Sequence, residues 1–94
     1  MMDESIGVSL TRVENCIRAL ERDEFTTADV IREYRGRFGS DLGTDAYYSF
    51  NAQFGKLLKD NETCLGIVQI ASNTETKDDH GRRTHVSKWR LVNT

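Results

Sequence analysis

The spacing of apolar residues changes once along this chain, and the change separates a helical part from a strand part. Before Asp60 the apolar side chains recur every three or four residues, as they do along one face of a helix. From Cys64 onwards they gather in two short runs that are rich in β-branched residues, which is typical of strands. Helices followed by strands predict an α+β domain.

Three helices are expected in the first part. The first spans about 5–22, with its firm part from Ser9, and carries one apolar stripe made of Ile6, Leu10, Val13, Ile17 and Leu20. The third spans 45–60, and its inward face consists of Tyr47, Phe50, Phe54, Leu57 and Leu58. These stripes predict helices that bury one side each against a shared core.

The second helix has its own start and stop signals. Thr26 is placed to cap its first turn, and Asp29 follows three residues later, which is the spacing of a capping box. Two glycines, Gly36 and Gly39, end the helical pattern, and Gly39 is expected to supply the left-handed C-cap. A turn over 40–44 then leads to the third helix.

The second part predicts a long β-hairpin. Residues 64–72 and 85–92 read as two strands, and the polar segment 73–83 between them reads as their connecting loop. A hairpin alone is marginally stable in water, so we expect it to pack on the helices. The expected fold is a three-helix bundle followed by a long two-stranded antiparallel β-hairpin.

Length, charge and cysteine usage limit the classes of protein to which this chain can belong. Its 94 residues fit one domain, expected to span 1–94 with 1–5 mobile. The net charge of −2 excludes a uniformly basic nucleic-acid coat. No apolar run reaches the roughly 18–20 residues that cross a bilayer, and the acidic start is unlike a secretory signal. We therefore expect a cytosolic protein without a membrane partner, whose Cys16 and Cys64 are reduced thiols.

The element order resembles the winged-helix variant of the helix-turn-helix DNA-binding superfamily. The resemblance covers about 9–92 and rests on the order and lengths of the elements and on the pattern TTADVIREY…AYYSFNAQFGKLL…WRL. No signature motif accompanies it, so it indicates the superfamily shape and no particular family. It implies a protein that binds double-stranded DNA, with helix 45–60 as the recognition helix in the major groove and loop 73–83 as the wing. It also implies a transcriptional regulator that acts as a homodimer.

The resemblance assigns DNA contacts to two groups of residues. The outward face of helix 45–60 presents Tyr48, Ser49, Gln53, Lys56 and Lys59. Gln53 offers the paired donor and acceptor that match adenine, and the hydroxyl groups suit phosphates or sugars. The loop contributes Lys77, Arg82 and Arg83. Polar residues on a helix are also ordinary solvated residues, and the two arginines beside Asp78 and Asp79 also fit a salt-linked loop.

The distribution of charge leaves two functions open. Residues 1–45 carry a formal charge of −4, residues 46–76 carry −1, and residues 77–94 carry +3. The expected contact elements are thus the least acidic part of the chain, and two copies in a dimer would double their cations. The acidic first half supports an alternative, in which a winged-helix module or small inhibitor of the phage or mobile-element type docks on a basic protein.

Catalytic chemistry is not expected. The sequence has neither a P-loop nor a dinucleotide-binding glycine pattern. Asp78, Asp79 and His80 contain metal-ligating groups, but adjacent loop residues rarely converge on one ion. Cys64 and His85 could approach as a thiol–imidazole pair, with no third group to orient them. We therefore predict no enzyme, no cofactor and no metal site.

Overall fold

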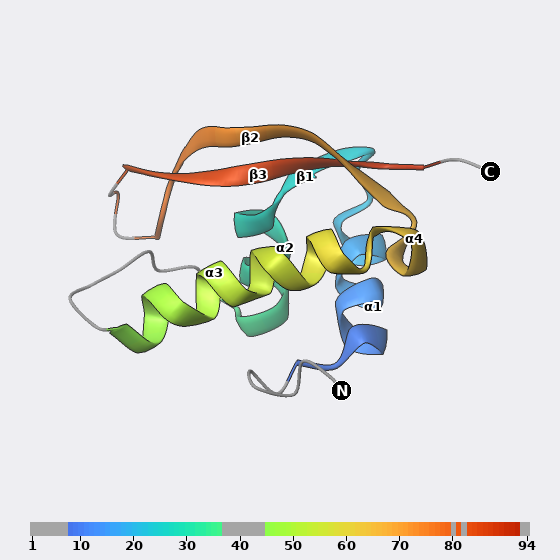
Figure 1. The fold of residues 1–94 in the computed structure, drawn as a ribbon, viewed down its shortest axis with the longest axis horizontal. Coiled ribbons are helices and arrows are strands. Elements are labelled where there is room, and N and C mark those ends of the chain that lie inside the picture. The colour runs from blue at the N-terminus through green and yellow to red at the C-terminus, as the bar shows by residue number, and fades with distance from the viewer. Residues whose placement is uncertain (1–7, 37–44, 80, 82, 93–94) are drawn as a thin grey trace.

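The computed structural model describes residues 8–36, 45–79, 81 and 83–92, with 45–49 as backbone only; the expected mobile segment 1–5 lies outside them. The sheet forms one layer, and the helices lie together on one of its faces (Figure 1). The elements in chain order are α1 (Leu10–Leu20), β1 (Glu24–Thr26), α2 (Thr27–Arg35), α3 (Asp45–Asp60), α4 (Glu62–Leu65), β2 (Ile67–Lys77) and β3 (Arg83–Leu91).

The α+β class is confirmed, but the sheet has a third strand that the sequence did not predict. Strand β1 pairs antiparallel with β3, which gives the order β1-β3-β2, and places Phe25 opposite Trp89. The two-stranded hairpin was therefore an incomplete prediction. A strand of three residues is too short to show an alternating pattern, so only its partner on β3 reveals it.

The boundaries of the hairpin also differ from the prediction. Strand β2 begins at Ile67, because the preceding residues form the short helix α4, which ends at Gly66 in the left-handed region with φ +71°. The predicted loop over 73–83 is wrong, since the ladder continues to the pair Lys77 and Arg83 and leaves only 78–82 as the connection. The strand ends consist mainly of polar residues that alternate between half-buried and exposed. Polar residues are also typical of loops, so the sequence favoured a loop over these positions.

Strand β2 lies at the edge of the sheet, and two features protect that edge. Its register against β3 shifts between Gln69 and Ala71 and again between Ala71 and Thr74, and Asn73 in the second interval has φ +54°. The Gln69 N–H donates to the carboxylate of Glu62 at 2.8 Å instead of facing a further strand. Bulges and blocked N–H groups both discourage pairing with another chain.

The capping signals of α2 are confirmed. The Thr26 hydroxyl accepts from the Asp29 N–H at 3.2 Å, and the Asp29 carboxylate accepts from the Thr26 N–H at 2.9 Å. Gly36 adopts φ +83° and supplies the left-handed cap that was expected of Gly39. Gly39 itself lies outside the described residues. Thus the start of the helix was predicted correctly and its end lies earlier.

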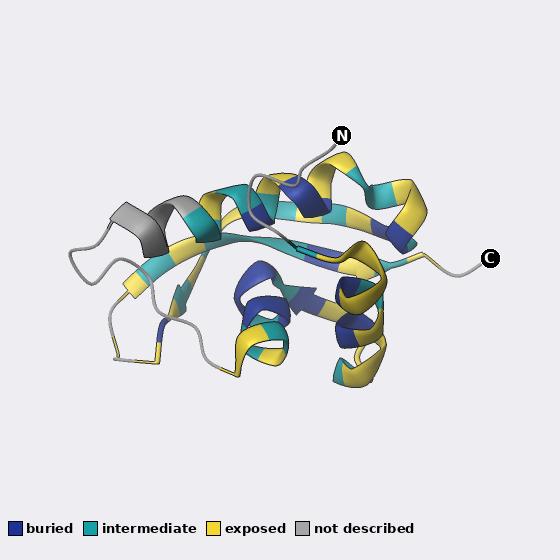
Figure 2. Ribbon diagram, turned by 90° about the horizontal axis from the view of Figure 1, so that it is seen from below, coloured by how far each residue is buried: buried dark blue, intermediate teal, exposed yellow. Residues whose placement is uncertain are grey.

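The core lies between the helices and the sheet (Figure 2). Its buried apolar residues come from all these elements: Val13, Cys16, Ile17, Phe25, Ala28, Val30, Ile31, Phe54, Leu57, Leu58, Leu65, Ile67 and Trp89. The predicted inward face of α3 is confirmed at Phe54, Leu57 and Leu58, while the side chain of Tyr47 lies outside the described ones. No described helix is both long and apolar enough to cross a lipid bilayer.

Helix α1 begins at the Ser9 cap, as expected of its firm part, and ends on a strained residue. Glu21 closes it with φ +54°, where a side chain other than glycine costs conformational energy. Glu21→Gly is therefore expected to raise the free energy of unfolding by about 0.5–1 kcal/mol, measured by urea denaturation. Glu21→Ala removes the same charge and keeps the strain, so an equal gain in that variant would contradict this explanation.

Candidate nucleic-acid interface

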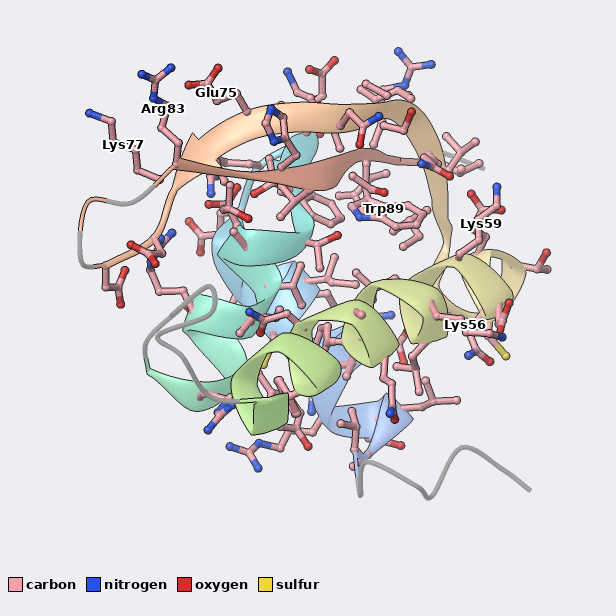
Figure 3. All side chains as sticks on the ribbon, turned by 60° about the vertical axis from the view of Figure 1, so that its left-hand side comes forward. Lys56, Lys59, Glu75, Lys77, Arg83 and Trp89 are labelled. Carbon is pink, nitrogen blue, oxygen red and sulfur yellow. The ribbon has the colours of Figure 1, made fainter. Side chains whose placement is uncertain are left out.

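Four of the predicted cations are described, and they lie at two separate positions. Lys56 and Lys59 lie near the C-terminal end of α3, whereas Lys77 and Arg83 lie at the closed end of the hairpin (Figure 3). Strand β2 begins near the first pair and ends at the second, and its 11 residues extend over roughly 35 Å. The four described cations of the predicted surface therefore form two separate groups.

The two lysines of α3 already have acidic neighbours. Lys56 Nζ lies 2.6 Å from Asp60 Oδ2, and Lys59 Nζ lies 3.5 Å from Glu62 Oε1. The lysine side chains remain 75% and 56% exposed, so these pairs are solvated and contribute only about 0–1 kcal/mol each. A phosphate group can therefore replace either carboxylate at little energetic cost.

Of the other three predicted residues of α3, the structure describes one with its side chain. Gln53 is half-buried and is engaged in an interaction within the chain, so it does not present a freely exposed amide. Tyr48 and Ser49 belong to α3, but their side chains lie outside the described ones. The structure therefore tests neither hydroxyl as a phosphate or sugar contact.

The closed end of the hairpin brings like charges together. Lys77 and Arg83 are direct partners in the β2–β3 ladder, and both are exposed. Like charges at opposed positions of an antiparallel pair destabilise it. Glu75 Oε2 lies 3.5 Å from Arg83 Nη1 and partly offsets this repulsion. The third predicted cation of this region, Arg82, lies outside the described residues.

Asp79 of the connection forms an ion pair with a helix, whereas the alternative of a salt link to Arg82 falls on a residue outside the described ones. Asp79 Oδ1 accepts from Arg32 Nε of α2 at 2.9 Å, and Asp78 is only 5% exposed. Arg32 was missed as a site residue because it belongs to the acidic half of the chain. Its partner lies 47 positions away, so no local spacing signals the contact.

An open groove of about 730 Å³ lies at the other end of the molecule, between α1 and the start of β2. Its walls are partly apolar, with Ile17, Val68 and Val92 among the lining residues. Glu14, Arg18 and Glu62 also line it, and Arg18 Nη2 lies 2.8 Å from Glu14 Oε2. Neither the groove nor its apolar lining was predicted, because its walls come from segments that are far apart in the sequence.

No protein-family model, curated protein or solved structure matches this chain. Its function is therefore proposed from the geometry of its own residues.

The residues considered for catalysis are not assembled into a site. Cys64 lies on α4, whereas His85 pairs with Glu75 in the distal half of the hairpin, so the thiol and imidazole lie apart. Burial raises the pKa of the Cys16 thiol, and the nearby carboxylate of Glu33 acts in the same direction. A buried thiol with a raised pKa is a poor nucleophile.

The candidate metal ligands of the hairpin connection, Asp78, Asp79 and His80, are not described as one group. Asp79 is bound to Arg32, and His80 lies outside the described residues. Within the described ranges, no group of three histidine, cysteine or acidic side chains is placed to hold a metal ion.

Proposed function

We propose that this protein is a small winged-helix-like DNA-binding domain, with α3 directed to the major groove and the closed end of the hairpin as the wing. The observation that carries the proposal is the exposed cross-strand pair of Lys77 and Arg83. Two cations at directly opposed positions cost stability unless an anion lies between them. A DNA phosphate supplies that anion and releases counterions when it binds.

The order of the elements supports the same proposal. A short strand after the first helix pairs with the last strand, so the hairpin is joined to the helical layer through β1. Helix α3 adds Lys56 and Lys59, whose exposed ion pairs exchange readily for phosphate contacts. Because one copy offers few cations, the proposed regulator acts as a homodimer that doubles them.

DNA binding is tested by mobility shift with a random-sequence duplex at two salt concentrations. Binding is expected at about 50 mM salt and is expected to weaken strongly by about 200 mM, because phosphate contacts dominate the affinity. The double variant Lys77→Gln/Arg83→Gln should bind all sequences more weakly and reduce the slope of log K against log salt by about 2.

Two single variants serve as controls for this experiment. Glu75→Gln removes the carboxylate beside Arg83 and should tighten binding, because the guanidinium no longer shares a counter-charge. Lys88→Gln removes a cation that is paired with Glu24 on the sheet, away from the hairpin end, and should leave the affinity nearly unchanged. Absence of any shift at the lower salt concentration would refute the proposed function.

The groove between α1 and β2 favours a second candidate function, which is binding of a basic protein. The apolar walls lie beside two carboxylates, Glu14 and Glu62, and one cation, Arg18, which is paired with Glu14. The excess of one negative charge suits a basic segment that carries one apolar side chain. The two functions are separated by pull-down from the native host extract, performed beside the mobility shift. A stable complex with a basic protein that is lost in Glu14→Lys, together with no DNA shift, would favour this second function.

A further inference from the structure

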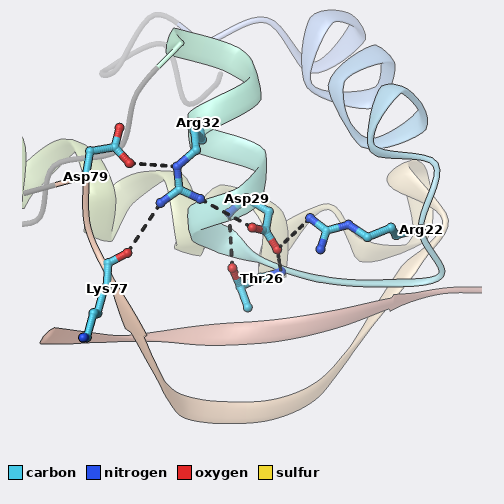
Figure 4. A network of polar contacts seen from close by, with 6 residues as sticks. All are labelled: Arg22, Thr26, Asp29, Arg32, Lys77 and Asp79. Atoms are coloured by element: carbon cyan, nitrogen blue, oxygen red, sulfur yellow. Dashed lines mark hydrogen bonds and ion pairs between the residues drawn. The ribbon is translucent and has the colours of Figure 1, made fainter. Parts of the chain in front are cut away.

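The closed end of the hairpin is held against α2 by one arginine (Figure 4). Arg32 donates from Nε to Asp79 Oδ1 at 2.9 Å and from Nη2 to the Lys77 carbonyl oxygen at 3.5 Å. It therefore contacts the last residue of β2 and the connection that follows. A planar guanidinium can hold two such acceptors at fixed angles, which an ammonium group cannot do.

Arg32 also forms an ion pair with Asp29, which lies three residues earlier on α2. Its Nη1 lies 3.6 Å from Asp29 Oδ1, and the other oxygen of that carboxylate lies 3.2 Å from Arg22 Nη2. The same carboxylate closes the capping box with the Thr26 N–H. The hairpin end is thus joined through Arg32 to a carboxylate that the helix start already fixes in place.

This connection matters because the distal hairpin is a two-stranded ribbon that extends beyond the residues of β3 paired with β1. Two register shifts separate it from the proximal part of the ladder, and its residues from Thr74 to Lys77 are all polar. On the opposite strand, Val86 packs against the core and gives the distal hairpin a second attachment. A two-stranded ribbon is only marginally stable unless it packs on another element. The side chain of Asp78, only 5% exposed, shows that the connection is packed against the rest of the protein.

We propose that Arg32 is a positioning residue for the DNA-binding surface, which holds the hairpin end on α2 and so fixes Lys77 and Arg83 relative to α3. The inference rests on the proposed DNA-binding function. A contact surface whose two parts are already correctly placed loses less conformational entropy on binding. Loss of the connection is therefore expected to weaken binding even though the DNA-contacting cations remain.

Electrostatics and positioning predict opposite results for one substitution. Asp79→Asn removes a negative charge, so a purely electrostatic effect would strengthen DNA binding. The variant also replaces the charged acceptor of Arg32 with a neutral amide oxygen, which weakens the attachment of the hairpin end and therefore DNA binding. We expect this weakening to prevail by about three- to tenfold. Arg32→Lys keeps the charge but loses the paired geometry, and a similar weakening is expected.

The experiment measures DNA affinity as a function of salt for the wild type and for both variants. Because a positioning residue makes no phosphate contact, the slope of log K against log salt should stay unchanged while the affinity falls. Glu33→Gln is the matched control, since it removes one acidic charge from the exposed surface of the same helix outside this network. It should bind DNA as tightly as the wild type or more tightly. Unchanged or tighter binding by Asp79→Asn would overturn the inference.

Amide hydrogen exchange gives a readout that does not depend on DNA. The Gly81 N–H donates to the Asp78 carbonyl oxygen at 3.0 Å within the connection, and its exchange should accelerate in Asp79→Asn and Arg32→Lys. Core amides such as that of Trp89 should not change. Unchanged exchange at Gly81 in both variants would refute the positioning role. If the wild type binds no DNA, the proposed function fails and the role in DNA binding fails with it; faster exchange would still show that Arg32 holds the hairpin end.

Discussion

Trp89→Ala is expected to lower the free energy of unfolding by about 3–5 kcal/mol. Trp89 is fully buried in the core. It lies opposite Phe25 in the β1–β3 ladder. Its indole Nε1 donates to Thr27 Oγ1 at 2.9 Å, and that hydroxyl lies 3.5 Å from the Ser87 carbonyl oxygen, to which it donates. The Trp89 side chain therefore links β3 to α2 and fills part of the core. A domain of this size is stable by roughly 5–15 kcal/mol, so the loss removes a large share of the total.

Two milder variants separate the volume of the ring from its hydrogen bond. Trp89→Phe keeps an aromatic ring but loses the indole N–H, and Thr27→Val keeps the shape of its partner but leaves the N–H without an acceptor. Leaving a buried donor unsatisfied costs about 1–3 kcal/mol, so Thr27→Val should be clearly destabilising. Urea unfolding is followed by far-UV circular dichroism, because the chain has no other tryptophan for fluorescence. A loss below about 1 kcal/mol for Trp89→Ala would contradict this account of the core.

The features that could be predicted from the sequence are those set by neighbouring residues. The capping box of Thr26 and Asp29 depends on a spacing of three, and it forms as predicted. Helix α3 spans the predicted 45–60, because its apolar stripe keeps one period over four turns. The ion pairs of Lys56 with Asp60 and of Lys59 with Glu62 have helical spacings of four and three, so the sequence contained the signal for them.

The features that could not be predicted depend on contacts between distant segments. Strand β1 exists because Phe25 meets Trp89, 64 positions later, and three residues carry no periodic signal of their own. The polar ends of β2 and β3 become strands because each finds a partner across the hairpin. The same limit applies to the candidate site, where the pairing of Arg32 with Asp79 attaches the hairpin connection to α2.

One aromatic residue joins α3 to α2. Phe54 is fully buried, and its ring centroid lies 5.7 Å from that of Tyr34 in an edge-to-face arrangement and 5.6 Å from that of Phe50. Tyr34 belongs to α2, so this contact joins the proposed recognition helix to its neighbour. Aromatic pairs of this geometry contribute about 0.5–1.5 kcal/mol beyond the area that they bury.

Phe54→Ala is accordingly expected to cost about 3–5 kcal/mol of stability, measured by urea denaturation. Lys56→Ala, at an exposed position of the same helix, should change stability by no more than about 0.5 kcal/mol. In the Phe54 variant, amide exchange should accelerate along α3 before it does at Trp89, because the helix loses its contact with α2 while the sheet keeps its own partners. Equal acceleration along α3 and at Trp89 would mean that the helix and the sheet unfold as one unit. That result would contradict a local role of Phe54 in attaching α3 to α2.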